Sequence, residues 1–323
     1  MRFGRCIGVG VFGLLLVSGA TEARAVTFVS GDVFASVAQG NVQQHRPDGT
    51  LVNTLNIGTG GFTTGMAFDA AGNLYVTGFG AGTVAKFDAN GNLLDGEFIK
   101  HLPTPESIVF DSSGHLYVGT LGGRIKKFDL SGTLLQTFSN GRSDWIDLKA
   151  DQKTMLYTQE GGQILQWDLA TDTALPVFAT IAEAGGAFAL RILPDGGVLL
   201  ADEAAVRRFN SAGVEIQTYD AAGEDTWFAL NLDPDGTSFW SGNFGSADLY
   251  RFHIASGAML KTFNTGTGGD TLFGVGIFGE KTQGCTECGE VRQVNGVVPE
   301  PASMLLFGFG FGPLGLLAMG WRS

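Results

Sequence analysis

The middle of the chain repeats one short sequence pattern at intervals of about 40 residues. Residues 66–75 read Met-Ala-Phe-Asp-Ala-Ala-Gly-Asn-Leu-Tyr, and residues 108–117 read Ile-Val-Phe-Asp-Ser-Ser-Gly-His-Leu-Tyr. Weaker copies end at Tyr157, Leu199 and Phe239, and Phe34 marks an earlier copy. The region from Asp32 to Gly279 therefore holds six copies. A repeat of this length predicts one structural unit per copy, packed against its neighbours.

Each copy predicts four short strands. Apolar residues alternate at Met66 and Phe68, which is the period of two expected for a strand. An Asp-x-x-Gly turn follows, because glycine tolerates positive φ. Further on, each copy carries a second pattern, an apolar residue followed by two others and usually an aromatic residue, as in Val84-Ala-Lys-Phe87. A last short strand follows this pattern, such as Thr133–Phe138 in the next copy. Four strands in about 40 residues are typical of a β-propeller blade.

The number of strands predicts how the ring closes. The first copy lacks its leading strand, whereas Thr271–Phe278 supplies a leading-type strand with no blade behind it. We therefore predict an all-β fold over residues 26–279, a six-bladed β-propeller with four-stranded antiparallel blades, closed by this C-terminal strand in the first blade. The repeat resembles the six-bladed propellers of the NHL and gluconolactonase-like group, over about three quarters of the chain.

The N-terminal residues predict export. Arg2 and Arg5 precede an apolar run, Cys6–Ala20, and Ala23-Arg24-Ala25 has the small residues of a cleavage site. Residues 1–25 therefore read as a secretory signal peptide, which implies the Sec export machinery as a partner. Its removal leaves 17 basic and 31 acidic residues, a net charge of −14. A chain so acidic is not expected to bind nucleic acid.

The C-terminal residues predict an anchor. Pro299, Glu300 and Pro301 precede 18 uncharged residues, Met304–Trp321, and Arg322 follows them. As a helix, 18 residues extend about 27 Å, close to the lower limit for crossing a bilayer. Residues 304–321 therefore predict a transmembrane helix, with a buried C-terminal strand or helix as the alternative.

This tail, residues 298–323, resembles the PEP-CTERM sorting signal of Gram-negative bacteria. The resemblance rests on Pro299-Glu300-Pro301, the apolar run and the terminal Arg322. It implies an exosortase as a partner and an inner-membrane-anchored precursor. It also implies a later location in the cell envelope, at the cell surface or in the extracellular exopolysaccharide matrix. The family carries many unrelated ectodomains, so the tail assigns no catalytic residue.

Residues 280–297 are expected to be a linker that carries Cys285 and Cys288. Outside the cytoplasm, two cysteines this close predict a local disulfide. A redox site would need a thioredoxin-like context, and a zinc site would need two further ligands nearby.

Acidic and amide side chains fall where the loops of one propeller mouth are expected. They are Glu106, Asp144, Asp147, Glu160, Asp202, Glu203, Asp225 and Asn243. Such oxygen ligands suit Ca²⁺ or another divalent metal. The gluconolactonase-like resemblance implies one Glu, one Asn and one Asp around a metal, and Glu106, Asn243 and Asp202 match that set by residue type and approximate blade position. The alternative is a solvated acidic rim without a metal.

Aromatic residues are expected beside the same mouth. They are Phe62, Phe79, Trp145, Trp227, Phe244 and Phe273. Such rings suit sugar binding, but they also suit packing between blades. We therefore predict a non-catalytic binding or scaffold protein for a surface glycan or protein, with no cofactor. The alternative is a metal-dependent lactonase-type hydrolase or lyase that uses the acidic mouth.

Overall fold

The computed structural model describes residues 26–181 and 185–288, which all belong to one compact unit, Met1–Val291. The predicted signal peptide, the predicted sorting signal and the end of the predicted linker lie outside the described residues.

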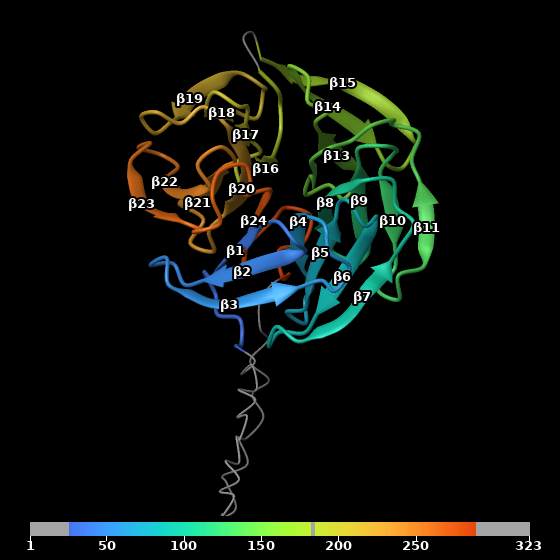
Figure 1. Cartoon of the computed structure of the whole chain (residues 1–323). Helices are drawn as coiled ribbons and strands as arrows, with labels where there is room; N and C mark the ends of the chain where they lie inside the picture. Colours follow the sequence, from blue (N-terminus) through green and yellow to red (C-terminus); the bar gives the residue numbers. More distant parts are fainter. Residues whose placement is uncertain (1–25, 182–184, 289–323) are drawn as a thin grey trace, which may run out of the picture. The chain divides into compact units, whose positions relative to one another are not determined.

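The described residues form six four-stranded antiparallel sheets, which follow one another as blades around a common centre (Figure 1). This confirms the predicted all-β six-bladed propeller. Blade 1 contains β24 (Gly274–Ile277), β1 (Val33–Ser36), β2 (Asn41–His45) and β3 (Leu51–Asn56). Blade 2 contains β4 (Thr63–Phe68), β5 (Leu74–Gly78), β6 (Thr83–Phe87) and β7 (Leu93–Ile99). Blade 3 contains β8 (Pro105–Phe110), β9 (Leu116–Thr120), β10 (Lys126–Phe128) and β11 (Leu134–Thr137).

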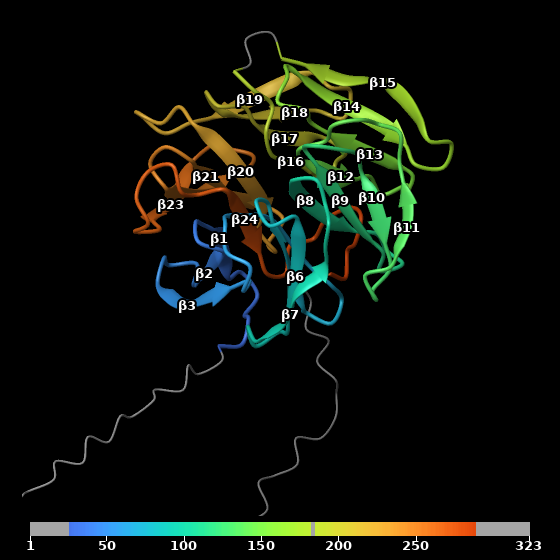
Figure 2. The same cartoon turned by 45° about the vertical axis from the view of Figure 1, so that its right-hand side comes forward.

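The second half of the ring has the same order. Blade 4 contains β12 (Ile146–Leu148), β13 (Thr154–Tyr157), β14 (Gln163–Asp168) and β15 (Thr173–Thr180). Blade 5 contains β16 (Leu190–Ile192), β17 (Val198–Ala201), β18 (Val206–Phe209) and β19 (Glu215–Tyr219). Blade 6 contains β20 (Trp227–Leu232), β21 (Ser238–Asn243), β22 (Asp248–His253) and β23 (Met259–Asn264). In each blade the first strand in this order is innermost, and the last lies on the perimeter (Figure 2).

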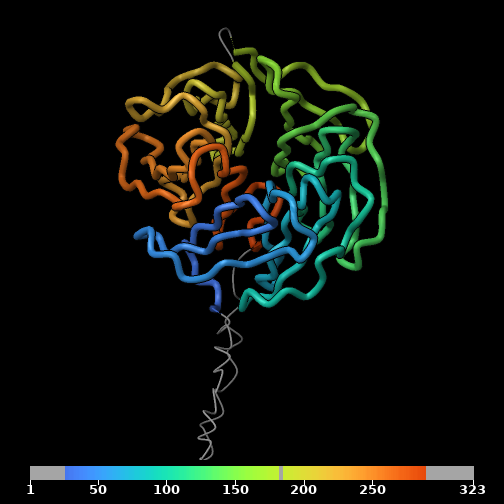
Figure 3. Tube along the Cα trace, viewed as in Figure 1, coloured from blue at the N-terminus to red at the C-terminus, as the bar shows by residue number. Residues whose placement is uncertain are grey.

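The ring closes as predicted. The C-terminal strand β24 pairs antiparallel with β1, with Val33 opposite Ile277 and Ser36 opposite Gly274. The first and last strands of the described chain therefore lie side by side (Figure 3). This pairing supplies the innermost strand that the first repeat lacks.

The Asp-x-x-Gly turns join the first and second strands of blades 2 and 3. In the turn after β4, Asp69 Oδ1 accepts hydrogen bonds from the backbone N–H groups of Ala71 and Asn73, both at 2.9 Å. Gly72 completes the turn at φ 81°. The carboxylate thus accepts hydrogen bonds from turn N–H groups that would otherwise have no partner in the protein.

Aromatic side chains and hydroxyl groups join neighbouring blades. Phe28, Phe34, Phe68 and Phe278 pack edge to face with ring centroids 4.9–5.9 Å apart, between blades 1 and 2. Closer to the axis, Ser36 Oγ donates to the carbonyl of Thr64 at 2.7 Å. Ser107 and Thr158 make equivalent bonds between later blades. These contacts hold neighbouring blades together where the inner strands begin. This end of the ring is called the mouth below.

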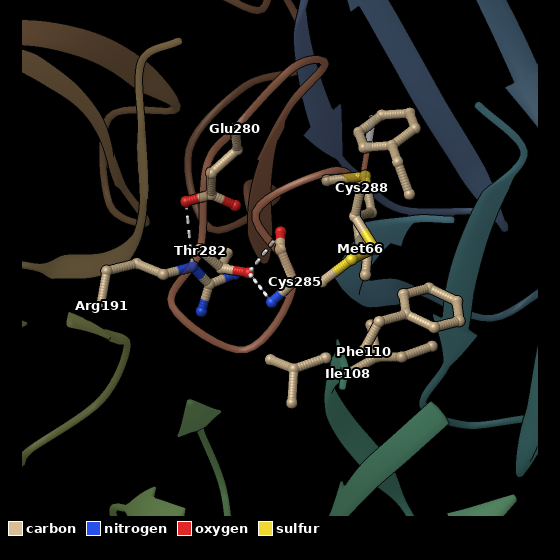
Figure 4. A pocket seen from close by; sticks show the side chains of 11 residues that line it. Met66, Ile108, Phe110, Arg191, Glu280, Thr282, Cys285 and Cys288 are labelled. Carbon is tan, nitrogen blue, oxygen red and sulfur yellow. Dashed lines mark hydrogen bonds and ion pairs between the residues drawn. A yellow bond between two sulfur atoms is a disulfide. The ribbon is translucent and has the colours of Figure 1, made fainter. Parts of the chain in front are cut away.

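Residues 280–288 pack against the opposite end of the ring, where the inner strands finish (Figure 4). The Glu280 carboxylate accepts hydrogen bonds from Arg191 Nε at 3.1 Å, Asn231 Nδ2 at 2.6 Å and Leu232 N at 2.7 Å. The Gln283 amide donates to the carbonyl of Leu193 at 2.5 Å. The first half of the expected linker is therefore part of the packed structure, because its polar side chains satisfy the ends of blades 5 and 6.

The described ranges contain no helix, and hence none long and apolar enough to cross a bilayer. The predicted transmembrane segment 304–321 lies outside them.

Candidate functional site

Six equivalent side chains surround the mouth, one from each blade. Each lies two residues before the first apolar residue of the repeated pattern in the innermost strand, such as Met66 in blade 2 or Ile108 in blade 3. In blade order from blade 2 they are Thr64, Glu106, Asp144, Phe188, Phe228 and Phe273. In blades 2, 3 and 6 the pairing register shifts at this point, as in a β-bulge. Blades 2 to 4 thus present polar groups, and blades 5, 6 and 1 present phenylalanines.

The acidic half of the mouth contains three carboxyl groups and one guanidinium. Arg142 Nε lies 2.9 Å from Asp144 Oδ1, and the same guanidinium pairs with Glu160. The Glu106 side chain faces this group from blade 3. Burial, reinforced by the charges of Asp144 and Glu160, raises the pKa of Glu106 to about 8. Burial also raises the pKa of Asp144 to about 6, although Arg142 opposes that shift.

Several buried polar atoms at the mouth have no hydrogen-bond partner. They are Asp144 Oδ2, Trp145 Nε1 and Asn243 Nδ2. Within the described residues no group donates a hydrogen bond to the Glu106 carboxyl, which is 6% exposed. Buried polar atoms are nearly always paired in folded proteins, so each of these atoms is a point that a ligand or water can complete.

The apolar half of the mouth is a continuous arc of phenylalanine rings, called the phenylalanine collar below. Phe79 and Phe273 both stack with Phe62, at 4.8 and 4.5 Å between centroids. The contacts continue through Phe244 and Phe228 to Phe188, at 5.5, 5.9 and 4.9 Å. All six rings are partly exposed. The two contacts of Phe62 are stacked, whereas the other three are tilted by 41–55°.

Two of the predicted aromatic residues are not available at the surface. Trp227 is fully buried and packs on Tyr250 with centroids 5.1 Å apart. Trp145 is 2% exposed and reaches Phe228 of blade 6, at 6.3 Å. Trp145 therefore underlies the mouth, and Trp227 belongs to the core of blade 6.

The predicted acidic residues divide into groups. The structure brings Glu106, Asp144 and Glu160 together. Asp202 is bonded elsewhere, to Arg207 and to Ala205 N at 3.0 Å. Glu203 and Asp225 are exposed. The Asn243 amide oxygen accepts a hydrogen bond from Thr226 Oγ1 at 2.6 Å.

Asp147 does not face the mouth with Glu106. It accepts hydrogen bonds from the backbone N–H groups of Leu148 and Ile192, at 2.9 and 2.8 Å. Its charge interacts with Arg191, the partner of Glu280. Asp147 therefore belongs to a buried charge cluster towards the opposite end of the ring.

The acidic groups of the mouth are not gathered as metal ligands within residues 26–181 and 185–288. No group of three or more His, Cys, Asp or Glu side chains in the described ranges is arranged to hold a metal ion. In the Glu-Asn-Asp set implied by the gluconolactonase-like resemblance, two members are engaged by other side chains. The Asp202 carboxylate is bonded to Arg207 and the Asn243 oxygen to Thr226.

At the opposite end, a pocket lies between blades 2 and 3 and residues 280–288 (Figure 4). Cys285 and Cys288 form a disulfide there, with Cα atoms 5.4 Å apart. Both cysteines are buried in the same hydrophobic cluster as Phe110. The disulfide therefore contributes to the packing of residues 280–288 against the ring.

Our sequence reasoning missed Phe188, Phe228 and Arg142. The first two occupy the ring position of Glu106 and Asp144, two residues before Leu190 and Leu230. Aligning the blades on those apolar residues would have found both phenylalanines. Arg142 precedes β12 in a loop whose course the repeat does not predict, and no sequence signal identifies it.

Comparisons with known proteins support the fold. A family model for the strictosidine synthase-like N-terminal region matches residues 85–128, a segment that includes Glu106. No curated protein matches the chain. Among solved structures, a chain in the crystal structure of a nidogen/laminin complex is 15% identical, with a TM-score of 0.62. That match covers 75% of this chain and 97% of the other. The chain therefore shares the six-bladed propeller fold with that protein.

Proposed function

We propose that the chain is an exported, envelope-sorted propeller that acts as a non-catalytic binding or scaffold protein at the cell surface or in the exopolysaccharide matrix. The ligand, a surface glycan or a protein, binds at the mouth. The single observation that carries the binding role is the combination at the mouth of unpartnered buried polar atoms with the phenylalanine collar. Fold alone would be a weaker basis, because propellers serve many functions.

The location rests on the two ends of the sequence. The Sec machinery would export the chain, and an exosortase would act at Pro299, Glu300 and Pro301 after residues 304–321 hold the precursor in the inner membrane. The buried Cys285–Cys288 disulfide suits an oxidising compartment outside the cytoplasm.

The enzyme alternative would need a set of metal ligands at the mouth. The three clustered carboxyls are not arranged around a metal, and Asp202 and Asn243 are bonded to other side chains. These features favour binding over lactone hydrolysis at this site.

Binding of the labelled full chain, in nonionic detergent, to surface polysaccharide and surface proteins of the producing cells tests the proposal. We expect Phe228→Ala, which removes the collar ring between Phe244 and Phe188, to weaken binding about tenfold or more. Leu94→Ala, on the exposed perimeter strand β7, is the matched control and should bind as the unchanged chain does. Divalent-metal-dependent lactone hydrolysis that disappears in Glu106→Gln would contradict the non-catalytic role.

A further inference from the structure

The two halves of the mouth differ in depth. Glu106 and Asp144 are 6% and 3% exposed, whereas the six rings of the phenylalanine collar are partly exposed. The mouth therefore combines buried carboxyls on one half with partly exposed aromatic rings on the other. This favours a ligand with an apolar stem and a polar end.

The polar end of the ligand must be compatible with a mouth that has more carboxyl groups than cationic groups. Glu106, Asp144 and Glu160 share one cation, Arg142, which contacts Asp144 through Oδ1 and leaves Oδ2 without a partner. The Glu106 carboxyl also lacks a hydrogen bond, within the described part of the chain. A second cation with N–H donors would satisfy both groups.

The collar argues against a sugar ring. Stacking of a sugar needs a free aromatic face, but Phe62 is already stacked with Phe79 and with Phe273. Partly exposed rings instead suit contact with methylene groups, which lysine and arginine stems supply.

We propose that the mouth is a receptor for a lysine or arginine side chain of a partner protein, with the aliphatic stem against the phenylalanine collar and the cationic head between Glu106 and Asp144. This inference rests on the proposed binding role and names the ligand chemistry. Asp144 Oδ2 and the Glu106 carboxylate accept the new hydrogen bonds, while Arg142 remains on Asp144 Oδ1.

Binding of such a cation is coupled to proton release. Glu106 carries a proton at neutral pH because burial and the charges of Asp144 and Glu160 raise its pKa to about 8, against the opposing charge of Arg142. A bound cation favours the ionised carboxyl, so the proton leaves when the ligand binds. Affinity should therefore rise as the pH increases from 6 to 8.

The test uses the full chain in nonionic detergent and the peptide acetyl-Gly-Gly-Lys-Gly-Gly-amide, measured by isothermal titration calorimetry in two buffers of different ionisation enthalpy. We expect one site, proton release, and affinity that rises about tenfold between pH 6 and 8. Acetylation of the lysine, Asp144→Asn and Glu106→Gln should each weaken binding about tenfold. Asp225→Asn, at an exposed acid beside the same mouth, is the control and should change affinity less than about twofold.

Three outcomes would overturn the inference. The acetylated peptide could bind as tightly as the charged one, or Glu106→Gln and Asp144→Asn could leave affinity unchanged. A glucosamine trimer or a neutral glucose trimer could bind in place of the peptide. If that sugar binding is lost in Phe228→Ala, the proposed binding role stands and only the cation inference fails. If no peptide or sugar binds and metal-dependent lactone hydrolysis appears, both fail.

Discussion

Glu106 lies at the bulge that opens β8, and only 6% of the residue is exposed. Of the charges that act on it, Asp144 and Glu160 oppose its ionisation and Arg142 favours it. Because burial dominates, the folded protein holds a proton there that the unfolded chain releases above pH 4.5. The contribution of Glu106 to stability is therefore greatest while the pH is below that value, and it falls as the pH rises towards 8. The sequence predicted the presence of this acid at the mouth, but not its burial, which depends on three neighbouring blades.

Glu106→Gln should remove this part of the pH dependence. We expect the unchanged protein to lose roughly 2–4 kcal/mol of unfolding free energy between pH 5 and pH 9 through this group, and the variant to lose much less. Urea unfolding at both pH values measures the difference. Asp225→Asn serves as the control, because an exposed acid should leave the pH dependence as it is. Equal pH dependence in Glu106→Gln and the unchanged protein would show that Glu106 is ionised in the folded state at pH 7.

At the scale of the element, each inner strand runs from the mouth to the opposite end of the ring. Asp144 and Asp147 lie three residues apart near β12, yet one faces the mouth and the other binds Leu148 N and Ile192 N. The sequence placed both at the mouth, because the repeat shows where a strand begins but not which way side chains point after an irregular start. The turns were easier to predict, since their Asp and Gly requirements are local.

Gly72→Ala tests the turn after β4. Its φ of 81° is unfavourable for alanine, whereas the added methyl would meet its nearest neighbours, Ala89 and Phe278, at an ordinary 3.5 Å. The cost is therefore one of backbone conformation, and we expect a loss of about 1 kcal/mol in urea unfolding. Gly80→Ala is the matched control, since Gly80 has no positive φ and nothing near its added methyl. A stability loss in the control as large as in Gly72→Ala would rule out the conformational explanation.

Glu280→Ala tests the segment 280–288. The change leaves Arg191, which is 3% exposed, without its carboxylate, and it removes the acceptor of Asn231 Nδ2 and Leu232 N. Arg191 then keeps only its charge interaction with Asp147, and we expect the unfolding free energy to fall by about 3 kcal/mol or more at pH 8. Glu97→Ala is the control, because its 3.9 Å pair with Lys100 is exposed and weak. A loss no greater than that of Glu97→Ala would mean that residues 280–288 add little to the ring.

At the scale of the whole molecule, the six blades and their closure followed from the sequence because each repeat is similar to its neighbours. The residues that make the ends of the ring different, such as Phe188, Phe228 and Glu280, vary from blade to blade. Their partners lie in other blades, so their contacts depend on the closed ring. The candidate site was therefore predicted only in part, as a group of acids whose members separate between the mouth, the surface and the opposite end.

Ring closure itself can be tested by shortening the chain. A chain that ends at Asp270 lacks β24, so β1 becomes an open edge and the buried inner strands β4 and β20 lose the strand that lies between blades 6 and 2. Because this exposes core residues such as Val33 and Phe34, we expect aggregation or loss of cooperative unfolding. A chain that ends at Gly279 keeps β24 but lacks Glu280, and it should stay soluble with a lowered melting temperature. A chain that ends at Cys288 should melt with the same cooperativity as the full chain. Cooperative melting of the chain that ends at Asp270, at the temperature of the chain that ends at Gly279, would show that β24 is not needed to hold the ring closed.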